Sequence, residues 1–87
     1  MANIKQSQKR HRQSEKARVR NKAVRTRVKN SIKEVRSAIR VNDKDQAQSA
    51  LRQANSVLDR AASKGVIHRR KATRRISRLS RKVDTME

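Results

Sequence analysis

The sequence has no cysteine, proline, phenylalanine, tyrosine or tryptophan, and its 87 residues include a single glycine. Without cysteine the chain has no disulfide, no thiolate zinc site and no thiol nucleophile. Without aromatic side chains it lacks the platforms on which single-strand binding proteins stack bases. Because glycine and proline also supply most hairpin turns, their shortage disfavours a β-sheet fold.

Acidic residues and long apolar runs are scarce as well. No apolar run approaches the roughly 18 residues that a membrane-spanning helix needs. The opening residues, Met1–Lys5, contain no apolar segment of the kind found in secretory signals. Seven acidic residues stand against 26 lysines and arginines, which gives a formal net charge of +19. Since charge of one sign at this density repels itself, the compact state needs a polyanionic partner or high salt.

The residues that are present favour helices, because alanine, arginine, lysine and glutamine are good helix formers. Only 32% of the residues are hydrophobic and 38% are charged, which is close to the composition of disordered chains. Apolar residues nevertheless recur at helical spacing in three segments, 17–41, 44–63 and 68–84. The positions are Ala17, Val24, Val28, Ile32, Val35 and Ile39; Ala47, Leu51, Ala54, Leu58 and Ala61, flanked by Ala50, Val57 and Ala62; and Ala72, Ile76, Leu79 and Val83. This pattern predicts one all-α domain, a three-helix bundle.

Local signals mark the two connections between these segments. Asp43, with a glutamine three residues later, resembles a capping box at the start of the second helix. Gly65 fits the left-handed residue that ends this helix, and Val66–Ile67 should then fold back onto the core. By residue type His68 is a poor N-cap, so the third helix begins without a clear capping residue. We expect the tail, 84–87, to fray.

The first helix is too long for its partners. From about Gln6 to Arg40 it would span about 50 Å, whereas the other two would span about 30 and 25 Å. Residues 1–16 carry no apolar line that could pack on protein. This basic N-terminal extension therefore projects beyond the bundle, or stays disordered until a partner binds. For the free protein we expect disorder over 2–16, with a helix forming there once a partner binds.

Basic residues form continuous faces on the first and third segments, whereas the second is nearly neutral. On the first helix the face consists of Arg18, Lys22, Arg25, Lys29, Lys33, Arg36 and Arg40, and on the third of Arg70, Arg74, Arg78 and Arg81 with Lys71 beside them. A run of charges is usually no more than a solvated face. Like charges four residues apart, however, each destabilise a helix by tenths of a kcal/mol. Neutralisation by phosphates explains these faces better, so they predict nucleic-acid binding.

Other functional classes fit the sequence less well. An intermolecular coiled coil is unnecessary, because three apolar stripes complete one another within the chain. A basic-zipper protein is disfavoured, since the seam is interrupted at Asn42–Asp43. A cationic membrane helix needs a strong apolar face, which the N-terminal segment lacks. A DNA-compacting architectural protein remains an alternative. His11 and His68 stand alone and the acids form no pair, so we expect no enzyme, no metal site and no cofactor.

Short segments along the whole chain resemble a known family. They are Met1–Lys5, Lys9–Arg10, Gln13–Lys16, Arg20–Lys22, Lys33, Val35–Arg36, Asp43, Ala47, Leu58–Ala62, Lys64–His68, Lys71–Ala72, Arg74 and Ser77–Leu79. The chain resembles the bacterial-type small-subunit ribosomal protein 20 family, most specifically from Leu58 to Leu79. That family more often has asparagine where Arg70 stands and alanine where Thr73 stands.

The resemblance implies a three-helix bundle with a long N-terminal helix and a structural role on the cytoplasmic ribosome. It implies direct binding to 16S rRNA, in the 5′ domain and on the long penultimate stem, during 30S assembly. It implies no catalysis, no membrane, no small-molecule substrate and no obligate homo-oligomer. The candidate rRNA-binding residues are Lys5, Lys9, Arg10, His11, Arg12, Lys16, Arg18, Arg20, Asn21, Lys22, Arg25, Lys29, Lys33, Arg36, His68, Arg69, Arg70, Lys71, Arg74, Arg75, Arg78 and Arg81.

Overall fold

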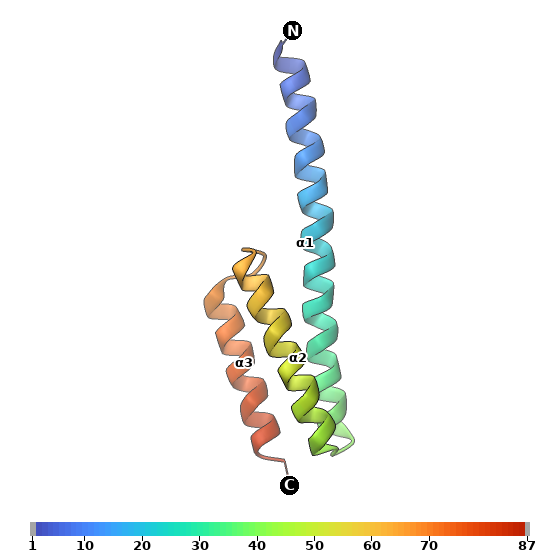
Figure 1. Ribbon diagram of the computed structural model, residues 1–87, viewed down its shortest axis with the longest axis vertical. Helices are drawn as coiled ribbons and strands as arrows, with labels where there is room; N and C mark the ends of the chain where they lie inside the picture. The colour runs from blue at the N-terminus through green and yellow to red at the C-terminus, as the bar shows by residue number, and fades with distance from the viewer. Residues whose placement is uncertain (1, 87) are drawn as a thin grey trace.

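Three helices make up the secondary structure of the computed structural model, which describes residues 2–86. They are α1 (Ala2–Arg40), α2 (Lys44–Ser63) and α3 (Arg69–Asp84), and there is no strand in this range. Figure 1 shows α2 running back beside the C-terminal half of α1, and α3 running in turn beside α2. The molecule measures 67 × 22 × 13 Å because α1 extends well beyond the other two helices. The predicted all-α bundle with a long first helix is confirmed.

The N-terminal extension is a direct continuation of α1. The helix begins at Ala2, and the side chains from Ile4 to Lys16 are all exposed. The structure thus gives this segment as a projecting helix, whereas the sequence favours a segment that is disordered without RNA. Since no other element covers it (Figure 1), only its own backbone hydrogen bonds and side-chain contacts support it.

Hydrogen exchange should show how weakly the projecting part of α1 is held. A helical segment without tertiary packing is marginal in water even with good helix formers. We expect the amides of Lys9–Lys16 to exchange rapidly in the free protein and slowly once RNA is bound. Amides of the buried half of α1, around Val35, provide the internal control. Slow exchange of Lys9–Lys16 without RNA would contradict the expectation.

The core follows the predicted stripes, with small shifts around each helix. Thirteen hydrophobic residues are buried, and they are Val24, Val28, Ile32, Val35, Ala38, Ala47, Ala50, Ala54, Leu58, Ala61, Ala72, Leu79 and Val83. Of the predicted stripe residues, Ile39, Leu51 and Ile76 are only partly buried at the edge of the core, and Ala17 is partly buried outside it. Ala38, which the predicted stripe does not include, is buried, and so is the flanking residue Ala50, because α1 and α2 meet along these small side chains. The same face buries Ser31, whose hydroxyl donates a 2.8 Å hydrogen bond to the carbonyl of Val28.

In the turn between α1 and α2, Asp43 bonds to both helices. Asn42 adopts a left-handed conformation with φ of 59°, and the N–H of Asp43 donates to the carbonyl of Ala38 at 3.0 Å. The carboxylate of Asp43 then accepts a hydrogen bond from the N–H of Gln46 at 3.1 Å, which caps α2. Half of the predicted capping box is therefore present. The reverse half is replaced, since the N–H of Asp43 is already bonded to α1.

The glycine signal at the end of α2 is confirmed. Gly65 has φ of 77°, and its N–H donates to the carbonyl of Ala62 at 3.0 Å. The next N–H, of Val66, donates to the carbonyl of Ala61, also at 3.0 Å. These two bonds form the Schellman arrangement, and Val66 and Ile67 pack against the core as expected. The short connection places α3 back against α2.

The C-terminal tail is more ordered than we expected. Met86 is partly buried against the core, and its carbonyl accepts a 3.2 Å hydrogen bond from the ammonium group of Lys44. Fraying is therefore not seen as far as residue 86, and Glu87 lies outside the described residues.

Within the described part of the chain, no helix is long and apolar enough to cross a bilayer.

Candidate nucleic-acid interface

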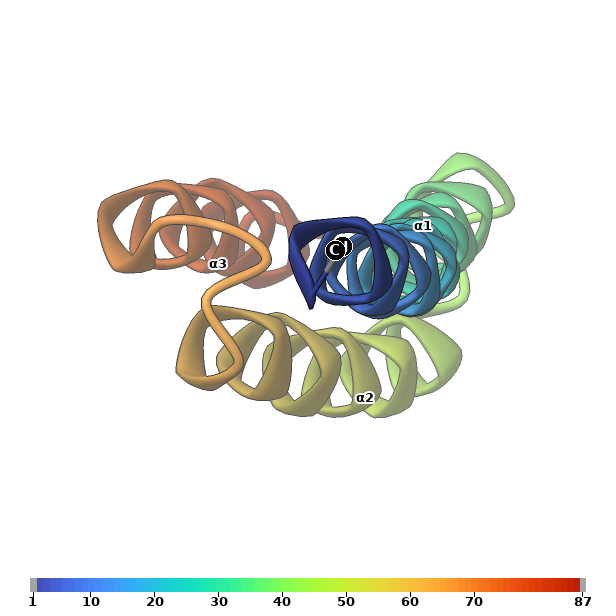
Figure 2. The same cartoon turned by 90° about the horizontal axis from the view of Figure 1, so that it is seen from above.

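A groove separates α1 from α3. Both helices pack on α2 and touch each other only slightly. Figure 2 shows them lying on the same side of α2. Two hollows of about 560 and 590 Å³ adjoin along this groove and share lining residues from both helices. The groove is thus built by the long basic helix on one wall and the short basic helix on the other.

The walls of the groove carry positive charge only. Ten of its 16 lining residues are lysines or arginines, and none is acidic. They are Arg25, Lys29, Lys33 and Arg36 from α1, and Lys71, Arg74, Arg75, Arg78, Arg81 and Lys82 from α3. Charge of one sign in a concave surface concentrates the potential and attracts polyanions. The groove is therefore suited to a chain of phosphates.

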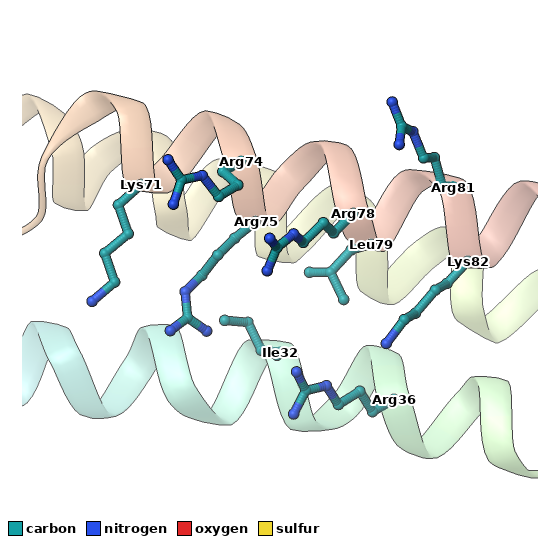
Figure 3. A pocket seen from close by; sticks show the side chains of 9 residues that line it. All are labelled: Ile32, Arg36, Lys71, Arg74, Arg75, Arg78, Leu79, Arg81 and Lys82. Atoms are coloured by element: carbon teal, nitrogen blue, oxygen red, sulfur yellow. The ribbon is translucent and has the colours of Figure 1, made fainter.

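The floor of the groove is part of the hydrophobic core. Val28, Ile32 and Leu79 line it and are at most 8% exposed, and Val66 and Ile67 close one end. Figure 3 shows Ile32 and Leu79 lying between the two basic walls. Since these side chains also hold the helices on α2, the packing that forms the bundle fixes the distance between the walls.

His68 marks the start of the α3 wall and corrects one expectation. It is the N-cap of α3, and its Nδ1 accepts a hydrogen bond from the N–H of Arg70 at 3.1 Å. The imidazole thus satisfies one of the free N–H groups at the helix start, a role that serine or aspartate usually fills. His68 lines the same groove as the basic residues, so its placement orients both the helix and the wall.

Few cations of the chain have a carboxylate partner. Among the described residues the ion pairs are Arg18 with Glu15 at 3.0 Å and Arg69 with Asp59 at 3.4 Å. Both pairs are exposed, and pairs of this kind contribute little to stability. Neither lies in the groove, so its cations are not neutralised by the described part of the protein. In the same range, no three histidine or acidic side chains gather as they would around a metal ion.

The structure brings ten of the 22 predicted site residues together in the groove. They are Arg25, Lys29, Lys33, Arg36, His68, Lys71, Arg74, Arg75, Arg78 and Arg81. Another ten, Lys5, Lys9, Arg10, His11, Arg12, Lys16, Arg18, Arg20, Asn21 and Lys22, lie N-terminal to the groove along α1. Arg69 turns towards Asp59 and Ser63 of α2, and Arg70 is exposed outside the groove.

Sequence reasoning missed one groove residue, Lys82. Figure 3 shows its side chain reaching from α3 towards α1. The signal for it was present, because Lys82 lies seven residues after Arg75 and four after Arg78, which places it on the same side of the helix.

Comparison with known proteins identifies the family of the chain. The family model for ribosomal protein S20 matches residues 2–84 of the chain. The chain belongs to the ribosomal protein S20 family. The resemblance seen in the sequence is thereby confirmed over nearly its full length.

Individual members of the S20 family match the chain from end to end. Small ribosomal subunit protein bS20 of Maridesulfovibrio salexigens is 62% identical over 86 residues, 99% of either chain. The protein of the same name from Oleidesulfovibrio alaskensis is 59% identical over 87 residues, the full length of both. A more distant bS20, from Syntrophobacter fumaroxidans, is 45% identical over 86 residues, 99% of this chain and all of the relative.

Proposed function

We propose that the chain is a structural protein of the small ribosomal subunit in the cytoplasm, where it binds 16S rRNA directly. Its contacts lie in the 5′ domain and on the long penultimate stem, and they stabilise the folding of this RNA during 30S assembly. The protein is not an obligate homo-oligomer. It performs no catalysis, needs no cofactor, and takes no membrane or small molecule as a partner.

The acid-free groove between α1 and α3 is the observation that carries this proposal. Ten lysines and arginines face one concavity, and no carboxylate of residues 2–86 lines it to neutralise them. RNA phosphates supply that neutralisation, and the release of their counterions favours binding. The names of the relatives, which place them in the small ribosomal subunit, support the same role for this chain.

The projecting part of α1 extends the same interface. Its exposed residues include Lys5, Lys9, Arg12 and Lys16, which have no protein surface to contact. A helix of this charge fits between RNA segments, where phosphates on more than one side neutralise it. We expect the groove to fix the orientation of the bundle and the projecting helix to reach a second RNA element.

Competition between RNA and DNA tests this function. A labelled 5′-domain fragment of 16S rRNA is bound to the full chain at about 150 mM salt, where non-specific electrostatic binding is weak. Unlabelled fragment and duplex DNA of equal charge are then added in parallel. The fragment should displace the label at far lower concentration than DNA. Equal displacement by DNA would contradict the ribosomal role and favour the DNA-compacting alternative.

A further inference from the structure

Three cations line the junction between the two hollows of the groove. Arg36 of α1 and Lys71 and Arg75 of α3 each line both hollows, together with Ile32. In Figure 3 the side chains of Lys71 and Arg75 reach from α3 towards α1, and Arg36 lies on the facing helix. The junction is therefore formed by both walls at once, unlike the ends of the groove.

Arg75 differs from every other lysine and arginine of the groove. It is partly buried, whereas the other nine are exposed. Among the described residues neither Arg75 nor its neighbours Arg36 and Lys71 has an ion pair or a side-chain hydrogen bond with protein. The side-chain nitrogens of Arg75 are not among the buried unpaired atoms of the described residues, so its N–H groups stay open to a ligand in the groove.

We propose that Arg36, Lys71 and Arg75 together bind one phosphodiester group of an RNA strand that lies along the groove. This phosphate links α1 to α3, two helices that scarcely touch each other in the protein itself. A guanidinium fork presents paired N–H groups that match two phosphate oxygens, and the lysine adds a point charge. The inference rests on the proposed function and assigns a particular subsite within it.

The groove suits an RNA strand better than an acidic helix of another protein. An amphipathic helix would need exposed apolar surface to pack on, but Ile32 and Leu79 in the floor are only 5% and 4% exposed. Further cations line the groove on either side of the junction, which matches the repeated charge of a sugar–phosphate backbone. Cations on both sides of the shared phosphate can therefore bind the neighbouring phosphates of the same strand.

Sharing one phosphate has a measurable consequence, because two cations on the same anion cannot act independently. We expect Arg36→Gln and Arg75→Gln each to weaken binding of the 16S 5′-domain fragment by about tenfold. The double variant should lose far less than the product of these two factors. Its salt slope should fall by about one unit in total, since one phosphate is released.

Arg25 and Arg81 provide a matched control pair. Arg25 lies on α1 and lines only one hollow, and Arg81 lies on α3 and lines only the other. They cannot share a phosphate with each other, so the losses from Arg25→Gln and Arg81→Gln should multiply. The slope of their double variant should fall by nearly two units. A further variant, Arg75→Lys, keeps the charge but not the fork, and should weaken binding several-fold while leaving the slope unchanged.

Each pair forms a double-mutant cycle of the parent, two single variants and one double variant. The RNA affinity of these four proteins is measured by salt titration, after circular dichroism has checked their helix content and melting. We expect Arg36→Gln and Arg75→Gln to melt at or above the parent temperature, because each removes a like charge from the groove. Losses that multiply at Arg36 and Arg75 as they do in the control would overturn the shared phosphate, as would parent-like binding of Arg75→Gln.

The double-mutant cycle tests the shared phosphate, and the competition experiment tests the ribosomal role, so the two proposals can fail independently. The cycle compares variants on one RNA, so its result does not depend on whether that RNA is preferred to DNA. A non-additive cycle combined with equal displacement by DNA would support the phosphate site and contradict the ribosomal role. Selective RNA binding with an additive cycle would do the reverse.

Discussion

Replacing Leu58 with alanine should unfold the free protein or bring it close to unfolding. Leu58 is fully buried and is among the largest side chains in the core with no exposed surface. Leucine-to-alanine changes at such positions cost about 2–5 kcal/mol, since they remove apolar contacts and leave a cavity. A helical domain of this size has only a few kcal/mol of stability, and here mutual repulsion of the basic residues reduces it further.

Thermal melting followed by circular dichroism measures this effect. Leu51 of the same helix provides the control, because it is only partly buried and Leu51→Ala should therefore cost clearly less. Leu79→Ala, at 4% exposure, should resemble Leu58→Ala. RNA should restore part of the Leu58→Ala fold by mass action, since it binds the folded state. If Leu58→Ala melted like the parent without RNA, the assignment of the core would be wrong.

The predicted helices and most of the core could be derived from spacing alone. Val24, Val28, Ile32 and Val35 repeat at helical intervals and are all buried. The turns could also be predicted from nearby residues. Gly65 ends α2 with a φ of 77°, which other residues rarely adopt. These features depend on neighbours within a few positions, which a sequence shows directly.

Features that depend on how helices meet were less accessible. Ala38 is buried because α1 and α2 approach along small side chains, but the apolar stripe predicted for the first helix does not include it. The cap at His68 depends on the rotamer of one imidazole, which the residue type does not indicate. The groove itself depends on the rotation of α3 about α2. The sequence therefore predicted two basic faces but not that they line one cavity.

The largest effect on function should come from removing cations from the groove rather than from α2. We expect Lys29→Gln, Lys33→Gln and Arg74→Gln each to weaken binding of the 16S 5′-domain fragment and to lower the salt slope by about one unit. Combining the three should lower the slope by about two to three units. All three residues line the groove, with two on α1 and one on α3.

The control for this experiment lies on α2. Arg52 and Arg60 are exposed and do not line the groove, so Arg52→Gln and Arg60→Gln should change neither affinity nor slope appreciably. Glutamine has nearly the helix propensity of lysine and arginine, so differences in folding do not confuse the comparison. If charge alone bound RNA, each lost cation would cost the same wherever it lay. Equal losses at Arg52 and Arg60 would therefore contradict docking through the groove and leave a polycation without a preferred face.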